Sequence, residues 1–456
     1  MTLLVIDWSS VGIKVLQFIL SFSILVVLHE LGHFLPARWF KCRVEKFYLF
    51  FNPWFSIFKK KIGDTEYGLG WVPFGGYVKI SGMIDESMDK EQMAQPAQPW
   101  EFRSKPAWQR LIIMLGGVTV NVLLAFAIFI MILWTWGDRY IPVSDLKYGL
   151  FADTLGRKIG LKDGDNIIAV AGKPVIRTNR IGSEIIMNEA KSITILRDGK
   201  QMDLPVPTGF ISQLSKNRLD HFVSIQYPQI IDSLTPYVKI LSGPPIQKGD
   251  TLIAIDGRFV KYYWDIYKDT SFAYVTRKDN ETMSFKRGND TVTVVLARTE
   301  KHSTGIGYRD PEKILGVVQI NYTLLQAIPA GISKAITTLR DYIRNLRLLF
   351  TSKEVKVQDN LGSVVSIASV FPPVWDWESF WSLTAIFSIL LAFMSVLPIP
   401  ALDGGHALFT LYEMISGRKP SDKFMEYSQM VGMVLLFGLM AYAMGLDIFR
   451  IFHWGK

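Results

Sequence analysis

Four long apolar runs constrain what this chain can fold into. They span residues 15–37, 111–137, 379–402 and 427–446, and they contain no Asp, Glu, Lys or Arg except Glu30 in the first run. Each run has at least 20 residues, which is about the length that a helix needs to cross the hydrocarbon core of a bilayer. We therefore predict a multi-pass α-helical membrane protein with four transmembrane helices.

The basic residues beside these runs predict their orientation. Residues 38–110 contain twelve lysines and arginines, whereas the segment before the first run contains only Lys14. Because short loops rich in Lys and Arg stay on the cytoplasmic side, the N-terminus and the long segment 138–378 are expected outside. These membrane-flanking residues account for the net charge of +9, and no nucleic-acid partner is expected.

The external segment contains an internal repeat. GLKDGDNIIAVAGKPV at 160–175 recurs 85 positions later as PIQKGDTLIAIDGRFV at 245–260. A period of this length fits two tandem domains of one fold, each with a Gly-Asp turn, an alternating strand and a second glycine turn. The stretch resembles the PDZ domain, which takes up a peptide as an extra strand at a sheet edge. Another kind of small β-rich domain is the alternative.

A different pattern follows the second copy. Apolar residues recur at a spacing of three and four, with basic residues between them; they are Ile332, Ile336, Leu339, Ile343, Leu346 and Phe350. This spacing predicts an amphipathic helix. Such a helix lies in the plane of the membrane interface or forms part of the core of the external domain, and the sequence favours neither.

The first apolar run contains the motif HELGH at 29–33. On a helix, His29 and His33 point the same way one turn apart, and Glu30 lies beside them. A carboxylate at mid-membrane costs about 3 kcal/mol unless it faces a polar interior. We therefore predict a zinc site in which the histidines bind metal and Glu30 takes a proton from an activated water. A structural histidine cluster is the alternative.

Two familiar third ligands of HExxH sites are missing. The positions at which a metzincin has Gly and His hold Pro36 and Trp39. The carboxylates nearest to the spacing of a thermolysin-like site are Glu45 and Glu66, and both lie in the basic cytoplasmic loop. The third ligand is therefore expected from another apolar run.

The third run ends in SVLPIPALDGGHALF, where Pro398 and Pro400 break the helix before Asp403. Broken backbone at membrane depth is tolerated only in a protein interior or beside a wet cavity. A carboxylate there suits a tetrahedral zinc with water in the fourth position. These arguments favour Asp403 as the third ligand and leave His406 as the alternative.

HELGH at 29–33 together with LDG at 402–404 resembles the site-2 protease family of intramembrane zinc metalloproteases. Within this family, the tandem PDZ pattern between the second and third runs is similar to that of the bacterial regulator of sigma-E protease. The likeness covers essentially the whole chain. It implies that His29, His33 and Asp403 hold Zn²⁺, in preference to His406, and that Glu30 activates water.

The resemblance also implies partners and a location. Substrates would be single-pass transmembrane proteins such as a trimmed anti-sigma factor, with remnant signal peptides as further candidates. The enzyme would lie in the bilayer of the bacterial cytoplasmic (inner) membrane, with PDZ domains on the periplasmic side that bind peptide or protein ligands. A membrane-anchored quality-control metalloprotease and a non-catalytic PDZ scaffold are the alternative functions.

Four residues are candidate substrate contacts. Asn121 closes a Gly-x-x-x-Asn pattern in the second run, where Gly116 and Gly117 would let a neighbouring helix approach closely; a helix–helix hydrogen bond is the alternative role of Asn121. Gly75 and Gly76 kink an alternating stretch that resembles the family's membrane re-entrant β-loop. Ser395 stands where the family pattern has Asn, so that contact departs from the pattern.

The predicted fold class adds an external β-rich tandem PDZ region and a membrane-associated β-loop to the helices. The predicted N-terminal part has a first transmembrane helix with HExxH at 1–40, a cytoplasmic loop with a re-entrant β-hairpin at 41–106 and a second transmembrane helix at 107–137. PDZ domains are predicted at 138–215 and 216–312, and a linker with an amphipathic interfacial helix at 313–375. A third transmembrane helix with LDG is predicted at 376–411, and a cytoplasmic loop with a fourth transmembrane helix at 412–456.

Overall fold

The computed structural model describes residues 7–83, 95–217, 219, 221–268, 279–298 and 304–453. The chain divides into two compact units. The first comprises Met1–Gly137, Asn321–Arg347 and Leu361–Lys456, and the second comprises Asp138–Ile320 and Leu348–Asn360. Part of the predicted cytoplasmic loop (84–94) and parts of the second predicted PDZ domain (269–278 and 299–303) lie outside the described residues.

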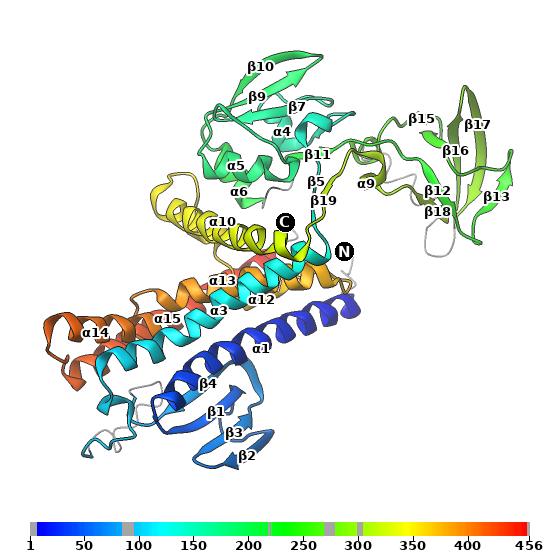
Figure 1. The fold of residues 1–456 in the computed structure, drawn as a ribbon. Coiled ribbons are helices and arrows are strands. Elements are labelled where there is room, and N and C mark those ends of the chain that lie inside the picture. Colours follow the sequence, from blue (N-terminus) through cyan, green and yellow to red (C-terminus); the bar gives the residue numbers. More distant parts are fainter. Residues whose placement is uncertain are drawn as a thin grey trace. The chain divides into compact units, whose positions relative to one another are not determined.

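Within the described residues, four helices of the first unit are long and apolar enough to cross a membrane (Figure 1). They are α1 (Trp8–Trp39), α3 (Ala107–Thr135), α13 (Trp377–Val396) and α15 (Asp422–His453). Asp7 caps α1 by accepting hydrogen bonds from the backbone N–H groups of Ser9 and Ser10. The prediction of four membrane-spanning helices is confirmed.

Small and polar residues join the first three of these helices. An added Cβ on Gly32 of α1 would lie 2.5 Å from the carbonyl oxygen of Gly116 on α3, so the two backbones touch there. The Ser388 hydroxyl of α13 donates to the Asn121 carbonyl of α3 over 2.7 Å. Between apolar helices in lipid, close backbone approach and interhelical hydrogen bonds are the main sources of association.

The amphipathic pattern after the repeat forms α10 (Leu324–Thr351). Its buried side packs on the membrane-spanning helices, where Ala335 joins a core cluster with residues of α3 and α13. Gly331 of α10 lies against Ile130 of α3, and the Tyr342 ring packs edge-on against Phe393 of α13. The small residues of α10 therefore pack inside the first unit, whereas Ile336 and Ile343 of the predicted apolar stripe remain 47% and 45% exposed.

The predicted β-loop forms a four-stranded sheet in the first unit. The strands are β1 (Val44–Phe51), β2 (Phe58–Ile62), β3 (Thr65–Leu69) and β4 (Val72–Ile80), in the order β2-β3-β1-β4. β4 is thus an edge strand, and it lies against α1, since an added Cβ on Gly76 would be 2.8 Å from Val26 Cγ1. The sheet brings β4 beside the helix that carries HELGH.

The sequence repeat in the second unit is also a repeat of structure. The first copy has β7 (Asn166–Val170), β8 (Lys173–Pro174), β9 (Ser192–Arg197) and β10 (Lys200–Pro205) in the order β10-β9-β7-β8. The second copy has β14 (Thr251–Ile255), β15 (Arg258–Phe259), β16 (Asn280–Arg287) and β17 (Asp290–Ala297) in the corresponding order β17-β16-β14-β15, with β13 (Lys239–Ser242) added beyond β17.

The Gly-Asp turn holds each copy together in the same way. Asp165 accepts two hydrogen bonds from the Arg197 guanidinium, at 2.7 and 2.8 Å. Asp250 accepts the corresponding pair from Arg287, at 2.6 and 2.8 Å. Both carboxylates are buried, and such bidentate pairs are among the strongest hydrogen bonds in proteins. The aspartate of the Gly-Asp turn therefore has the same structural role in both copies.

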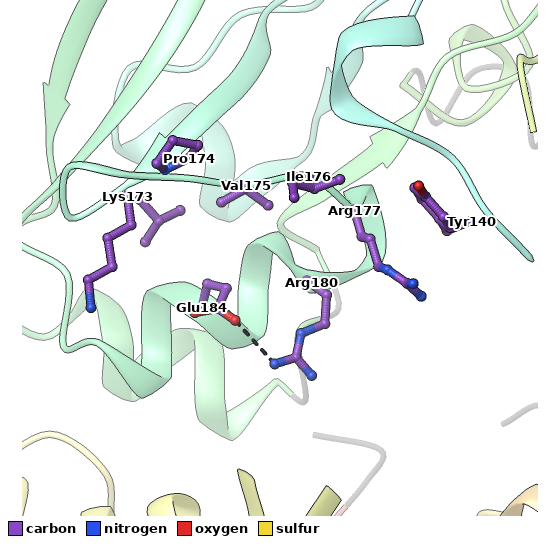
Figure 2. Close-up of a pocket in the computed structure, with 9 residues that line it drawn as sticks. Tyr140, Lys173, Pro174, Val175, Ile176, Arg177, Arg180 and Glu184 are labelled. Carbon is purple, nitrogen blue, oxygen red and sulfur yellow. Dashed lines mark hydrogen bonds and ion pairs between the residues drawn. The ribbon is translucent and has the colours of Figure 1, made fainter. Parts of the chain in front are cut away.

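The first copy carries a groove of about 330 Å³ between β8 and α5 (Ile181–Met187) (Figure 2). Val170, Val175 and Ile176 give it an apolar lining. Two ion pairs lie at its rim, Arg180 with Glu184 and Arg177 with Asp138. β8 is the edge strand of its sheet, so the groove runs beside a sheet edge.

Candidate metal centre

Three side chains from distant parts of the sequence converge in the first unit. His29 Nε2 lies 3.2 Å from Asp403 Oδ2, His33 Nε2 lies 3.3 Å from the same oxygen, and the two Nε2 atoms are 3.3 Å apart. The histidines come from α1, and Asp403 is the first residue of α14 (Asp403–Ser416). The three ligand atoms form a nearly equilateral triangle.

This triangle fits a tetrahedral zinc ion. Zn–N and Zn–O bonds are about 2.0–2.2 Å long, so two ligand atoms of a tetrahedral site stand about 3.3–3.5 Å apart. The three observed edges agree with that separation to within a few tenths of an ångström. Two imidazoles and one carboxylate are also the donor set of many catalytic zinc sites, which keep the fourth position open.

The triangle is not fully enclosed. The side chain of His33 is 6% exposed, whereas those of His29 and Asp403 are 12% and 21% exposed. Structural zinc sites take four ligands from the protein, whereas catalytic sites take three and keep the fourth position for water or substrate. The three side chains grouped here match the number of the catalytic class.

The ring of His33 is oriented by α3. Its Nδ1–H donates to the backbone carbonyl of Ile113 over 2.8 Å. A proton on Nδ1 leaves the lone pair of Nε2 free for a metal, and metal-binding histidines usually have such a partner. Ile113 thus selects the tautomer that a metal ligand needs.

Asn121 of α3 contacts His29, with its side-chain Nδ2 3.0 Å from His29 Nδ1. If His29 binds metal through Nε2, its Nδ1 carries the proton, and the Asn121 amide must be turned about its axis so that its oxygen accepts from Nδ1–H. The amide nitrogen then takes the buried position of Oδ1, which has no hydrogen-bond partner among the described residues. Asn121 was predicted as a substrate contact, and its position adds the orientation of His29 as a second role.

Gly117 makes room for both imidazoles. An added Cβ on Gly117 would lie 2.6 Å from His29 Cε1 and even nearer to His33 Nε2. Carbon atoms in contact are normally about 3.5–4.0 Å apart. The glycine of the Gly-x-x-x-Asn pattern is therefore required by the two histidines themselves, in addition to the helix contact that its neighbour Gly116 makes.

Glu30 lies between the histidines and the β-sheet. Its carboxylate is close enough to the backbone N–H of Val78 on β4, and to His29, His33 and Asp403, to interact with them electrostatically. The side chain that was predicted to act as the base therefore lies beside β4.

The other sequence candidates lie on β4, α13 and α14. Gly75 and Gly76 are in β4, and Gly75 has a φ of +144°, a backbone conformation that residues other than glycine rarely adopt. Ser395 is buried in the last turn of α13, and His406 lines a small cavity with Arg110 and Glu413.

Glu45 and Glu66 have other partners. Glu45 accepts from the Ser81 hydroxyl, and Glu66 accepts from the Tyr48 hydroxyl. Among the described residues that could hold a metal ion, the structure brings Asp403 to the histidines and leaves His406, Glu45 and Glu66 outside the group.

Sequence reasoning missed three supports of this site. One is a backbone carbonyl, that of Ile113, and no residue type encodes it. The second is Ser388, which holds the backbone of Asn121. The third is Gln429 of α15, which is buried and bonds the loop before Asp403. A polar residue inside an apolar run was the available signal for Ser388 and Gln429.

Comparison with known proteins finds matches along nearly the whole chain. The model of peptidase family M50 matches residues 17–439. Bacterial proteins that carry the name "putative zinc metalloprotease" align over nearly the full length. The chain is 25% identical to one from Thermotoga maritima (96% of this chain, 99% of the relative), 24% to one from Treponema pallidum (97% and 100%) and 28% to one from Campylobacter jejuni (96% and 94%).

Proposed function

Because the chain belongs to peptidase family M50, the site-2 protease family of zinc metalloproteases, we propose that it is an intramembrane endopeptidase that cleaves single-pass transmembrane segments. One observation carries the proposal. The triangle of His29, His33 and Asp403 joins a membrane-spanning helix to the segment that follows the third one, so that the chemistry lies within the helical bundle.

In this proposal, His29, His33 and Asp403 hold the zinc ion. When bound there, zinc supplies the Lewis acidity that polarises a peptide carbonyl and lowers the pKa of a water molecule. Glu30 acts as the general base that takes the proton of the attacking water, and it later passes that proton to the leaving amine. The Val78 N–H of β4 is near enough to the Glu30 carboxylate to interact with it in both transfers.

β4 gives the substrate an extended conformation beside the base. In a helical substrate every peptide bond is engaged in the helix, so the scissile segment must first unwind. An edge strand offers backbone groups that pair with such a segment, and β4 is an edge strand that contacts α1. Gly75 and Gly76 of β4 are proposed contacts, with the Asn121 amide and the Ser395 hydroxyl as further ones.

The two repeat domains are proposed to be a PDZ pair that filters substrates by the size of their external part. The groove beside β8 has the features of a peptide site, because it combines an apolar lining with a sheet edge. β6 (Leu150–Ala152) pairs with β11 (Val223–Ile225) in a separate two-stranded sheet. Of the two edge strands of the four-stranded sheet, β8 and β10, we propose β8 for the peptide because the groove lies beside it.

The remaining proposals concern the cellular setting. We place the protein in the bacterial inner membrane, with the basic segment 38–110 in the cytoplasm and the repeat domains in the periplasm, following the lysine and arginine distribution. A trimmed anti-sigma factor is the proposed substrate, and remnant signal peptides are further candidates. Both are single-pass segments with a small external part.

The decisive test uses the purified full-length protein and a single-pass model substrate in liposomes. The wild type should cleave it, and Glu30→Gln should be slower by about a hundredfold or more while it still binds zinc. Glu45→Gln, which changes a carboxylate of β1, is the matched control and should cleave normally. Equal cleavage by Glu30→Gln and the wild type would contradict the proposal, and cleavage of soluble casein alone would favour the quality-control alternative.

A further inference from the structure

The loop that carries Asp403 into the metal centre contains a strained residue. α13 ends at Val396 and α14 begins at Asp403, and Ala401 in the intervening loop has a φ of +97°. A residue other than glycine rarely adopts this conformation, and it persists only where the surroundings hold it. The strain lies two residues before the proposed ligand, so whatever holds Ala401 also determines the position of Asp403.

A buried amide on the fourth membrane-spanning helix holds this residue. The Ala401 backbone N–H donates to Gln429 Oε1 of α15 over 3.1 Å. The side chain of Gln429 is 4% exposed, whereas its neighbours Met430 and Val431 are 39% and 59% exposed. An amide within an apolar helix is costly unless it is paired. Its pairing with a strained backbone N–H therefore indicates a role in this loop.

A glycine one turn later brings the same face of α15 onto the loop. An added Cβ on Gly432 would overlap the Pro400 carbonyl and would lie 3.2 Å from Ala401 Cβ. Residues three apart on a helix share a face, so Gly432 and Gln429 contact adjacent loop residues together. Gly438, farther along the same helix, has no atom within 4 Å of such a Cβ. The close approach is thus specific to Gly432.

We infer that Gln429 and Gly432 are positioning residues, which hold Pro400 and Ala401 so that Asp403 is presented to the metal. The inference rests on the metal centre of the proposed function and assigns part of its geometry to α15. Without these contacts the loop relaxes, and Asp403 Oδ2 leaves the position that completes the triangle with the histidines. Changes in the residues that support a metal ligand typically weaken metal binding by about 10- to 100-fold.

The test measures zinc affinity of the full-length protein by competition with a chelator. Gln429→Leu removes the acceptor at similar side-chain volume, and Gly432→Ala separates the backbones. Each should weaken zinc binding by about tenfold or more. Gln429→Glu keeps an oxygen at the same reach and should restore binding to within a fewfold of the wild type. Gly438→Ala, the matched control on α15, should bind as the wild type does.

The outcomes separate this inference from the proposed function. Wild-type affinity in both Gln429→Leu and Gly432→Ala would overturn it, and so would an equal loss in Gly438→Ala, because any change in α15 would then have the same effect. The helix content of the metal-free protein, measured by circular dichroism, should be the same in all variants; a loss of helix that parallels the zinc loss would show a merely structural role. If His33→Ala bound zinc as tightly as the wild type, the metal centre itself would be wrong.

Discussion

Asp403 Oδ2 lies 3.2 Å from His29 Nε2, although the two residues come from opposite ends of the chain. Their closeness depends on α3, which packs against both α1 and α14. Carboxylate and imidazole groups in an apolar bundle are costly unless they are paired. In the proposed function a zinc ion pairs all three groups, and it thereby also links α1 to the start of α14.

Zinc should stabilise the folded protein for this reason. A ligand that binds only the folded state at a free concentration 100-fold above its Kd adds about 2.7 kcal/mol to the free energy of unfolding. Thermal unfolding of the purified protein, with and without added zinc, measures the effect. The wild type should unfold at a higher temperature with zinc, and His33→Ala should show no rise. A similar rise in both proteins would mean that zinc stabilises through another site.

Gly117→Ala should disturb the centre through the imidazoles. The added methyl group would lie 2.6 Å from His29 Cε1, so the ring has to move by about 1 Å. Zinc affinity should fall by about tenfold or more. Because alanine favours a helix more than glycine does, loss of α3 cannot explain the result. Gly12→Ala in α1, which meets no atom within 4 Å, is the control and should leave the affinity unchanged.

Asn121 offers a test of the His29 tautomer. Asn121→Asp keeps an oxygen that accepts from His29 Nδ1–H, whereas Asn121→Leu removes every acceptor at similar size. We expect Asn121→Leu to bind zinc about 10- to 100-fold more weakly and Asn121→Asp to remain near the wild type. Chelator competition measures both. If the two variants lose affinity equally, the carbonyl oxygen is not what orients the ring.

The second repeat domain should depend on its Asp–Arg pair. The Arg287 guanidinium lowers the pKa of Asp250 from its usual value of 3.8 by hydrogen bonding. Because the pKa is lower in the folded state, the stabilisation is fully present above 3.8 and is lost as the pH falls through the lowered pKa. Asp250→Asn should therefore destabilise this domain by about 2 kcal/mol at pH 5 and at pH 7.

Hydrogen exchange of the β14 and β16 amides reports this local stability. Asp290→Asn, which changes an exposed aspartate at the start of β17, is the control and should exchange as the wild type does. Unchanged protection in Asp250→Asn would show that the pair contributes nothing measurable to the domain.

The sequence predicted those features that depend on residues close together in the chain. The length of the four apolar runs predicted the four membrane-spanning helices. The Gly-Asp repeat predicted two domains of one topology, because a turn and an alternating strand are local signals. The pair Pro398 and Pro400 predicted the break before Asp403, which the structure shows as the loop between α13 and α14.

Features that depend on tertiary contacts could not be predicted in the same way. The carbonyl of Ile113 orients His33, and every residue has such a carbonyl. The amphipathic spacing of α10 indicated an apolar environment, but the contacts that its small residues Ala335 and Gly331 make with α3 and α13 depend on how the helices pack. The strain at Ala401 and its partner Gln429 appear only when the helices are packed.

The most direct test of the account is the zinc content of purified Asp403→Ala, measured beside the wild type and Glu30→Gln together with cleavage of the model substrate. We predict one zinc per chain and cleavage for the wild type, one zinc without cleavage for Glu30→Gln, and loss of both for Asp403→Ala. An Asp403→Ala protein that retains one zinc per chain and normal turnover would contradict the account.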